Sequence, residues 1–324
     1  MLFQEEEGKV DKQRNISLDI IKVVMAYCVV LLHQSAFYMV HHSADEIEAP
    51  AIRFILENGL FRIAVPFFLV VSGYFFVKIN NFSGFVKWCL RVGKLYVFWS
   101  LCYMLLCYYF NKFPAHWTDF IFGYMHLWYL LGTLLGGTLL WFMRKVTIRN
   151  LLLVAFLIYF LGLIIQEVSL CNFIKGPVGI YLSSTPVARN FFFFCFPIMS
   201  LGYAISKTNY DGKYHKNGIM LILALVLVAC ESYAQYIFVG YKSIDVMLMT
   251  PIAAALLFIY FKNMDITINS NYKLLVPLFS TAIYLGHWAV LLFLQDVDFF
   301  TQIIIVTILS LILVFLHRWV KFIL

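Results

Sequence analysis

The first apolar run of the chain, residues 18–40, reads LDIIKVVMAYCVVLLHQSAFYMV. A helix needs about 20 mostly apolar residues to cross a bilayer core of roughly 30 Å, so this run is long enough to span a membrane. Similar runs lie near 60–77, 92–110, 126–143, 151–166, 190–206, 218–239, 244–261, 274–294 and 300–320. The runs are continuous and lack the alternation of barrel strands. The sequence therefore predicts an all-α, polytopic bundle of about ten transmembrane helices.

Composition supports this class of protein. Of the 324 residues, 63% are hydrophobic and only 13% are charged, whereas about a quarter of a soluble domain is charged. The 17 Asp and Glu could not solubilise a globular surface of this size. The seven Cys form an odd number and lie mostly in or beside apolar runs, which excludes a secreted disulfide scaffold.

The Lys and Arg residues indicate a topology. When the segments between runs are numbered in order, seventeen of the 24 Lys and Arg fall in the set that begins at the N-terminus, and five in the other set. The positive-inside rule then predicts ten spans with both termini cytoplasmic. We expect one membrane domain over residues 1–324, with a cytoplasmic lead at 1–16 that is no signal peptide. The net charge of +7 follows from this topology and gives no reason to expect nucleic-acid binding.

Three ionisable residues lie in the first run: Asp19, Lys22 and His33. At 100° per residue they share one face of a helix, and Lys22 and His33 are about 16 Å apart along its axis. Ionisable groups inside a bilayer are rare and suggest function. Each also has a structural explanation: Asp19 can stabilise the helix dipole, Lys22 can snorkel to the interface, and His33 can bond a neighbouring helix.

Further polar candidates flank other runs. Arg91 and Lys94 stand at i and i+3 near the cytoplasmic start of the third run. They could be ordinary positive-inside anchors, or they could form a cationic entrance for a phosphate-bearing ligand. Ser72 lies in the second run, His126 opens the fourth at the outer face, and Arg189 precedes the sixth. No His has metal-ligand spacing with Cys or carboxylates, so we expect no metal site.

Several motifs together resemble one family, the acyltransferase-3 integral membrane acyltransferases. A basic residue, ten residues and a His occur in the first run as Lys22 to His33, with Lys where the family usually has Arg. The later motifs follow in order: Val65-Pro66-Phe67-Phe68-Leu69-Val70-Val71-Ser72-Gly73-Tyr74, Arg91-Val92-Gly93-Lys94-Leu95-Tyr96, His126-Leu127-Trp128-Tyr129-Leu130, Phe196-Pro197-Ile198-Met199-Ser200-Leu201-Gly202-Tyr203 and Tyr284-Leu285-Gly286-His287. The resemblance covers nearly the whole chain and is closest to members that have no soluble C-terminal domain.

The resemblance implies an enzyme of the bacterial inner (cytoplasmic) membrane. It would transfer an acyl group, usually acetyl from cytoplasmic acetyl-CoA, to a hydroxyl of a surface glycan or lipid-linked sugar. His33 would be the general base, with an acyl-His intermediate left open. Lys22, Arg91 and Lys94 would bind the donor. The supporting residues would be Asp19, Ser72, His126 and Arg189. We expect acetyl-CoA as a substrate, membrane lipid as surroundings, and no resident cofactor.

A second function class suits the same composition. Ten helices with an intramembrane His are also typical of a transporter or exporter of glycans or lipid-linked glycans. Many transporters contain two related halves with broken helices at corresponding positions, and no clear match exists between the first five runs and the last five. The acceptor, the acyl group and the oligomeric state do not follow from the sequence.

Overall fold

The computed structural model describes residues 15–41, 50–110, 123–182, 185–208, 214–264, 275–295 and 297–324. Within these ranges every regular element is a helix, which confirms the all-α prediction. Eight helical segments are long and apolar enough to cross a membrane. These are α1 (Ile16–His41), α2 to α3 (Pro50–Phe76), α4 (Phe82–Tyr109), η4 and α6 (Met125–Met143), α7 (Ile148–Leu170), α11 (Tyr214–Val239), α13 (Leu275–Phe293) and α14 (Phe299–Leu316).

Two shorter apolar helical segments complete the set of ten predicted runs. They are η5 with α10 (Phe191–Lys207) and α12 (Met249–Lys262). The fifth run, predicted as short, is longer than expected because α7 extends to both sides of it. Two small helices, α8 (Gly176–Leu182) and α9 (Thr185–Ala188), lie between α7 and η5.

The second span differs most from the prediction. It begins as α2 (Pro50–Phe54), passes through a π-helix η2 (Ile55–Leu60) and a 3-10 turn η3 (Phe61–Ile63), and continues as α3 (Ala64–Phe76). The expected start near residue 60 was wrong because polar residues interrupt the apolar pattern there. In the structure these residues pair along the helix, Arg53 with Glu57 and Arg62 with Asn58, so the polar positions remain helical.

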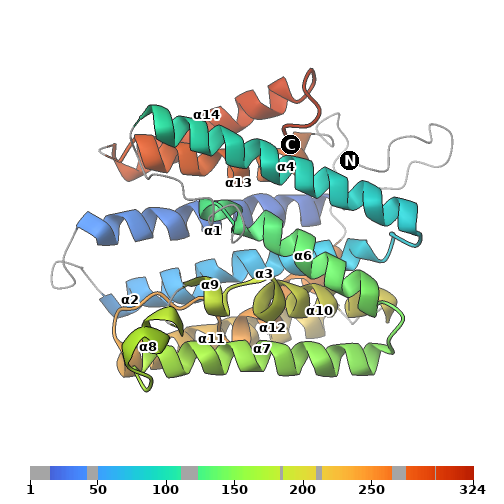
Figure 1. The fold of residues 1–324 in the computed structure, drawn as a ribbon, viewed down its shortest axis with the longest axis vertical. Helices are drawn as coiled ribbons and strands as arrows, with labels where there is room; N and C mark the ends of the chain where they lie inside the picture. Colours follow the sequence, from blue (N-terminus) through green and yellow to red (C-terminus); the bar gives the residue numbers. More distant parts are fainter. Residues whose placement is uncertain are drawn as a thin grey trace.

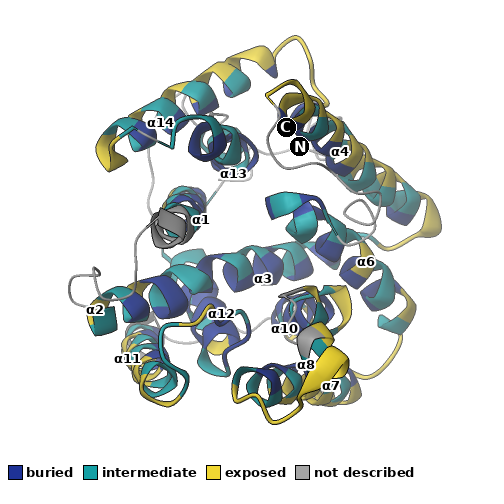
Figure 2. Ribbon diagram, turned by 60° about the vertical axis from the view of Figure 1, so that its left-hand side comes forward, coloured by how far each residue is buried: buried dark blue, intermediate teal, exposed yellow. Residues whose placement is uncertain are grey.

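Helix α1 occupies the middle of the molecule (Figure 1). It lies between α13 and α14 on one side and α3 on the other (Figure 2), and it contacts α13, α3 and α12. Its side chains Ala26, Val29 and Val30 are almost fully buried in these contacts. The polar residues of α1 are therefore held inside the bundle.

The closest helix pair is α3 with α10. A Cβ atom built on Gly73 would lie 1.9 Å from the carbonyl oxygen of Met199, and one built on Gly202 would lie 2.1 Å from that of Val70. Small residues of this kind let membrane helices approach closely. Two of the sequence motifs, around Ser72-Gly73 and Leu201-Gly202, thus form one packing interface.

The outer surface of the bundle is apolar. Exposed large side chains are concentrated on the outward faces of α7, α11 and α14, as the yellow faces of the ribbon show (Figure 2). They include Phe156, Leu157, Ile222, Leu223 and Ile308. A water-soluble protein rarely exposes contiguous apolar areas of this extent, so we assign these faces to lipid.

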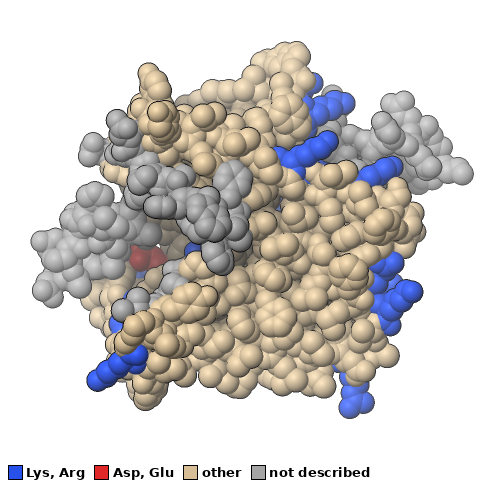
Figure 3. Space-filling view, viewed as in Figure 1, with Lys and Arg blue, Asp and Glu red and all other residues tan. Residues whose placement is uncertain are grey.

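Charged side chains are distributed unevenly along the bundle. Lys and Arg gather at the right-hand edge of Figure 3, which is the end where α4 begins and α6 ends in the same view (Figure 1). Helix α1 also begins at this end (Figure 1). The distribution agrees with the predicted positive-inside pattern. That this end faces the cytoplasm stays a prediction.

Candidate active site

His33 of α1 meets His287 of α13 in the interior of the bundle. The Nε2 atom of His287 lies 3.2 Å from Nδ1 of His33, and the carbonyl oxygen of Val29 lies 3.0 Å from the same Nδ1. Nδ1 of His287 lies 3.0 Å from the carbonyl oxygen of Ile283. His287 is fully buried, whereas His33 is half-buried.

These contacts determine where the protons lie. A carbonyl oxygen only accepts, so Nδ1 of His287 donates to Ile283, and in the neutral ring Nε2 of His287 carries a lone pair. Nδ1 of His33 therefore faces two acceptors, Val29 O and His287 Nε2, and must carry its proton. The lone pair of His33 is left on Nε2. An imidazole oriented in this way is a suitable general base.

His126 and Trp288 complete the surroundings of the histidine pair. The Trp288 ring packs edge-on against His33 with centroids 4.8 Å apart and stacks on His126 with centroids 5.5 Å apart. The rings of His126 and His287 are 4.9 Å apart. Both ring nitrogens of His126 are buried and have no hydrogen-bond partner among the described residues. Buried polar atoms are rarely left unpaired, which distinguishes His126 from the other two histidines of the cluster.

Two tyrosines fix the backbone around this cluster. The hydroxyl of Tyr284 donates to the carbonyl oxygen of His126 at 2.7 Å, and the hydroxyl of Tyr103 donates to that of Leu285 at 2.5 Å. These bonds tie α13 to η4 and α4 to α13, respectively. The histidines therefore stand on elements that are cross-linked by buried hydrogen bonds.

The cationic end of α1 has a different set of neighbours. Lys22 Nζ lies 3.3 Å from Oδ1 of Asp19, which is buried, and 5.8 Å from the ring centre of Phe75. Lys78 lies 5.0 Å from the same ring, and Lys262 lies 5.6 Å from the ring of Tyr74. We call Lys22, Lys78 and Lys262 the lysine cluster.

The other predicted donor residues lie elsewhere. Arg91 and Lys94 are exposed on α4, and Arg91 is close enough to His317 for its charge to act on that ring. Burial and the charges of Arg91 and Lys321 lower the pKa of His317. The lysines that join Lys22 at α3 were not predicted.

Ser72 lies between the two ends of the site. It lies near the side chain of Tyr129, and the Tyr129 ring packs edge-on against Tyr284 with centroids 5.4 Å apart. Polar side chains therefore extend along α3 and α6 from the lysine cluster toward the histidines.

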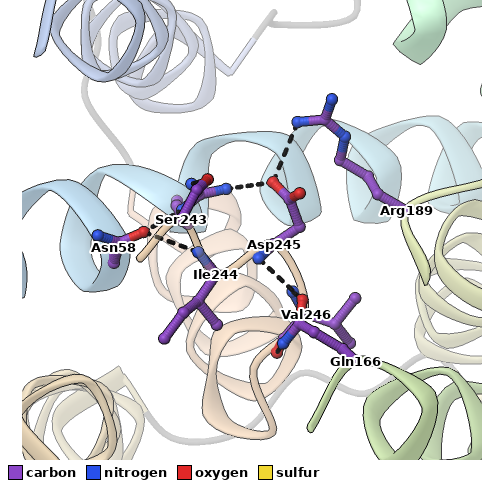
Figure 4. A network of polar contacts seen from close by, with 8 residues as sticks. Asn58, Gln166, Arg189, Ser243, Ile244, Asp245 and Val246 are labelled. Atoms are coloured by element: carbon purple, nitrogen blue, oxygen red, sulfur yellow. Dashed lines mark hydrogen bonds and ion pairs between the residues drawn. The ribbon is translucent and has the colours of Figure 1, made fainter. Parts of the chain in front are cut away.

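Arg189 belongs to a second polar network (Figure 4). Its Nη1 atom donates to Oδ1 of Asp245 at 3.0 Å, and Arg62 also binds that oxygen. Arg62 further donates to Ser243 Oγ at 2.7 Å and Asn58 Oδ1 at 3.2 Å. The Arg189 guanidinium carbon lies 4.6 Å from the Trp128 ring centre.

Asp245 is charged in this arrangement. Burial alone would raise the pKa of its carboxyl, but the guanidinium groups of Arg189 and Arg62 more than offset burial and hold the pKa below its usual range. The network therefore contains two guanidinium groups, of Arg62 and Arg189, that share the one carboxylate of Asp245. Nearby Glu57 is already bound by Arg53 and by the hydroxyl of Tyr241.

Side chains replace helical hydrogen bonds around Asp245. The chain has no regular secondary structure directly before α12, and Ile244, Val246 and Met247 are buried there. Gln166 accepts from the amides of Asp245 and Val246 and donates to the carbonyl of Val246. The carboxylate of Glu231 accepts from the amides of Leu248 and Met249, at the start of α12. This carboxylate satisfies amides that have no helical partner.

Comparison with known proteins identifies the family. The family model Acyl_transf_3, described as "Acyltransferase domain", matches residues 15–319. The chain belongs to the acyltransferase-3 family. The resemblance read from its motifs is thereby confirmed, and His33, His126 and His287 all lie within the matched region of this acyltransferase.

The chain is also similar to two Enterococcus faecalis proteins named "Amino-acid racemase". It is 25% identical to one over 64% of its own length and 30% of the relative's, and 25% identical to the other over 78% and 38%. The chain thus spans about a third of the length of these relatives. No solved structure matches it significantly.

The structure adds residues that sequence reasoning did not place in the site of the acyltransferase. His287 and Trp288 contact His33. Asp245 binds Arg189, and Arg62 binds Asp245. The signal for His287 was available, because it is an ionisable residue in the middle of an apolar run. Asp245 also stands within an apolar run, at its start.

Proposed function

We propose that this membrane acyltransferase moves an acetyl group from acetyl-CoA to a hydroxyl of a surface glycan or lipid-linked sugar, with His33 as general base. The observation that carries the proposal is the tautomer of His33. Its Nδ1–H faces the Val29 carbonyl oxygen and His287 Nε2, which leaves Nε2 to accept a proton. His287 has the role that the carboxylate has in a Ser-His-Asp triad, because it orients the base.

The chemical step balances with His33 alone as proton carrier. Nε2 of His33 takes the proton of the acceptor hydroxyl while the hydroxyl oxygen attacks the thioester carbonyl carbon. The tetrahedral intermediate collapses, the carbon–sulfur bond breaks, and the imidazolium returns the proton to the CoA thiolate. The products are an ester and CoA-SH. General-base catalysis of this kind contributes about 10²–10⁴-fold.

The lysine cluster is the proposed binding site for the donor. CoA carries several phosphate charges, and three ammonium groups converge at Tyr74 and Phe75. Lys22 and His33 are about 16 Å apart along α1, a distance that an extended pantetheine arm can cover. Arg91 and Lys94 remain proposed as cations on the approach to this end. With this end at the cytoplasm, CoA would bind where it is made.

Mass spectrometry of surface glycans tests the proposed reaction. Cells with the protein should carry glycan species heavier by one acetyl group than cells without it. The matched control expresses His33→Gln at the same membrane level, and it should give the unmodified mass. Identical glycan masses in all three cultures would contradict the proposed reaction.

One observation favours a second candidate, a transporter. The span around α12 is interrupted by the buried segment without regular secondary structure before it, and broken helices are common at transporter sites. The second of the ten predicted spans is also interrupted. In a transporter with two halves of five spans each, the second span would correspond to the seventh and not to the eighth, so these two interruptions are not at corresponding positions. Uptake of a lipid-linked glycan into vesicles without acyl donor would support this candidate over the transferase.

A further inference from the structure

Arg189 has hydrogen-bond donors that its protein partner does not use. A guanidinium has five N–H donors, and among the described residues Asp245 is the only hydrogen-bond acceptor of Arg189, through Nη1. One guanidinium nitrogen points away from Asp245 (Figure 4). The side chain of Arg189 is 28% exposed, compared with 12% for Arg62. Arg189 is therefore oriented by Asp245 and still accessible.

Trp128 holds the same guanidinium from another side. The Arg189 guanidinium carbon lies 4.6 Å from the centre of the Trp128 ring, a distance at which a cation is attracted to an aromatic face. Trp128 follows His126 by two residues at the start of α6. Because His126 belongs to the histidine cluster, the contact holds Arg189 beside the segment that carries this cluster.

Among the described residues, the ion pairs of this network leave an excess of one positive charge. Arg62 and Arg189 share the single carboxylate of Asp245, while Arg53 and Glu57 pair with each other. A guanidinium with free donors on one edge binds carboxylate and phosphate groups in a bidentate manner. The site is thus suited to an anionic oxygen group on the molecule that reaches His33.

We infer that the acceptor is an acidic molecule, and that Arg189 binds its carboxylate or phosphate group so that a neighbouring hydroxyl meets Nε2 of His33. The inference rests on the proposed function, because it concerns the acceptor of that same reaction. Arg189 is linked through Asp245 to Arg62, which precedes α3, whereas the lysine cluster lies at Tyr74 and Phe75, at the end of α3. The acceptor and the CoA phosphates would therefore occupy different ends of the site. Asp245 and Trp128 are positioning residues for Arg189.

Binding of small probes tests the inference without any catalysis. The full-length protein in nanodiscs is titrated with two matched pairs: glucuronate against glucose, and glycerol 3-phosphate against glycerol. We expect at least one acid of the two pairs to bind about tenfold or more tightly than its neutral partner, because charge-assisted hydrogen bonds are stronger than neutral ones. A preference for glucuronate would indicate a carboxylate on the acceptor, and a preference for glycerol 3-phosphate would indicate a phosphate.

Variants identify the residue that is responsible. Arg189→Gln should abolish the preference for the acid, and Arg189→Lys should retain only part of it because the fork geometry is lost. Lys175→Gln is the matched control, since Lys175 is an exposed cation outside the network, and it should keep the full preference. Thermal melting of each variant confirms that it is folded.

The outcomes separate this inference from the proposed function. Equal binding of acid and neutral probe in both pairs, or an unchanged preference in folded Arg189→Gln, would overturn the inference. His33→Gln should keep the preference while losing acyl transfer. If acid binding depends on Arg189 and the wild-type protein transfers no acyl group to any acceptor, the anion site stands and the proposed reaction fails.

Discussion

Nε2 of His287 lies 3.2 Å from Nδ1 of His33, across the interface between α13 and α1. These residues are 254 positions apart in the chain. Because the other nitrogen of His287 donates to a backbone carbonyl, the contact makes His287 an acceptor and His33 a donor at Nδ1. One interaction thus links the fold of the bundle to the protonation state of the proposed base.

Replacing His287 should lower the rate of transfer without changing substrate binding. We expect His287→Phe to reduce kcat about 10- to 100-fold, a part of the total that a general base contributes, with KM for both substrates unchanged. Gln retains an acceptor oxygen for Nδ1 of His33, so His287→Gln should recover part of the activity. Equal losses in the two variants would mean that His287 has only a packing role.

Removing the charge of Lys22 should weaken donor binding. We expect Lys22→Gln to raise KM for acetyl-CoA about tenfold with little change in kcat, and Lys22→Arg to stay near the wild-type value. Lys145→Gln is the matched control, because Lys145 is an exposed cation in the turn after α6. Steady-state kinetics at two salt concentrations measure this effect, which salt should reduce. A KM for Lys22→Gln within twofold of wild type would exclude Lys22 from donor binding.

The glycine contact between α3 and α10 should not tolerate a methyl group. In Gly73→Ala the new carbon would overlap the backbone of Met199, and overpacking costs about 1–3 kcal/mol or more. Gly93→Ala is the control, because the nearest atom to its Cβ would be Leu134 Cδ2 at 3.9 Å. Thermal melting in detergent should show a lower Tm for Gly73→Ala and an unchanged or higher Tm for Gly93→Ala.

Glu231 should stabilise the start of α12. Glu231→Gln removes one of the two oxygens that accept from Leu248 and Met249, and an unpaired buried amide costs about 1–3 kcal/mol. Hydrogen exchange at these two amides should become faster. Glu167→Gln is the control, since Gln235 keeps a bonding partner there, and it should leave exchange near α12 unchanged.

The Asp245 carboxylate should stabilise the protein at every pH near neutrality. Its pKa is below the usual range, so its contribution is fully present above the unfolded value of about 3.9 and is lost as pH falls through the lower folded value. Asp245→Asn should therefore lower Tm by the same amount at pH 5, 6.5 and 8. A difference that shrinks at pH 5 would mean that the pKa is raised instead.

The helices could be predicted because each apolar run is a local property of the sequence. Within the described ranges, eight helical segments are long enough to cross a membrane and two are shorter. The main error, at the start of the second span, has a physical cause. Arg53, Glu57, Asn58 and Arg62 reduce the local hydropathy, yet they pair within the helix. Hydropathy cannot detect such pairing.

The candidate site was predicted only in part, because its contacts join distant segments. The sequence identified His33 inside the first apolar run, His126 at the start of the fourth and Arg189 before the sixth. The structure brings His33 and His126 into one cluster with Trp288. The sequence did not indicate that Lys78 and Lys262 would lie near Lys22. Each of these two lysines stands at the end of another apolar run, where a cation normally interacts with the membrane surface. Nor did the sequence pair Arg189 with Asp245, which is 56 residues away.

The most direct test of the account is the transfer of labelled acetyl from acetyl-CoA to glycan acceptors by the purified protein in proteoliposomes. Wild type and His33→Gln are compared at equal amounts of folded protein. The account predicts labelled acceptor with wild type and a loss of about 100-fold or more with His33→Gln, in the range of general-base catalysis. Equal transfer by the two proteins would contradict it.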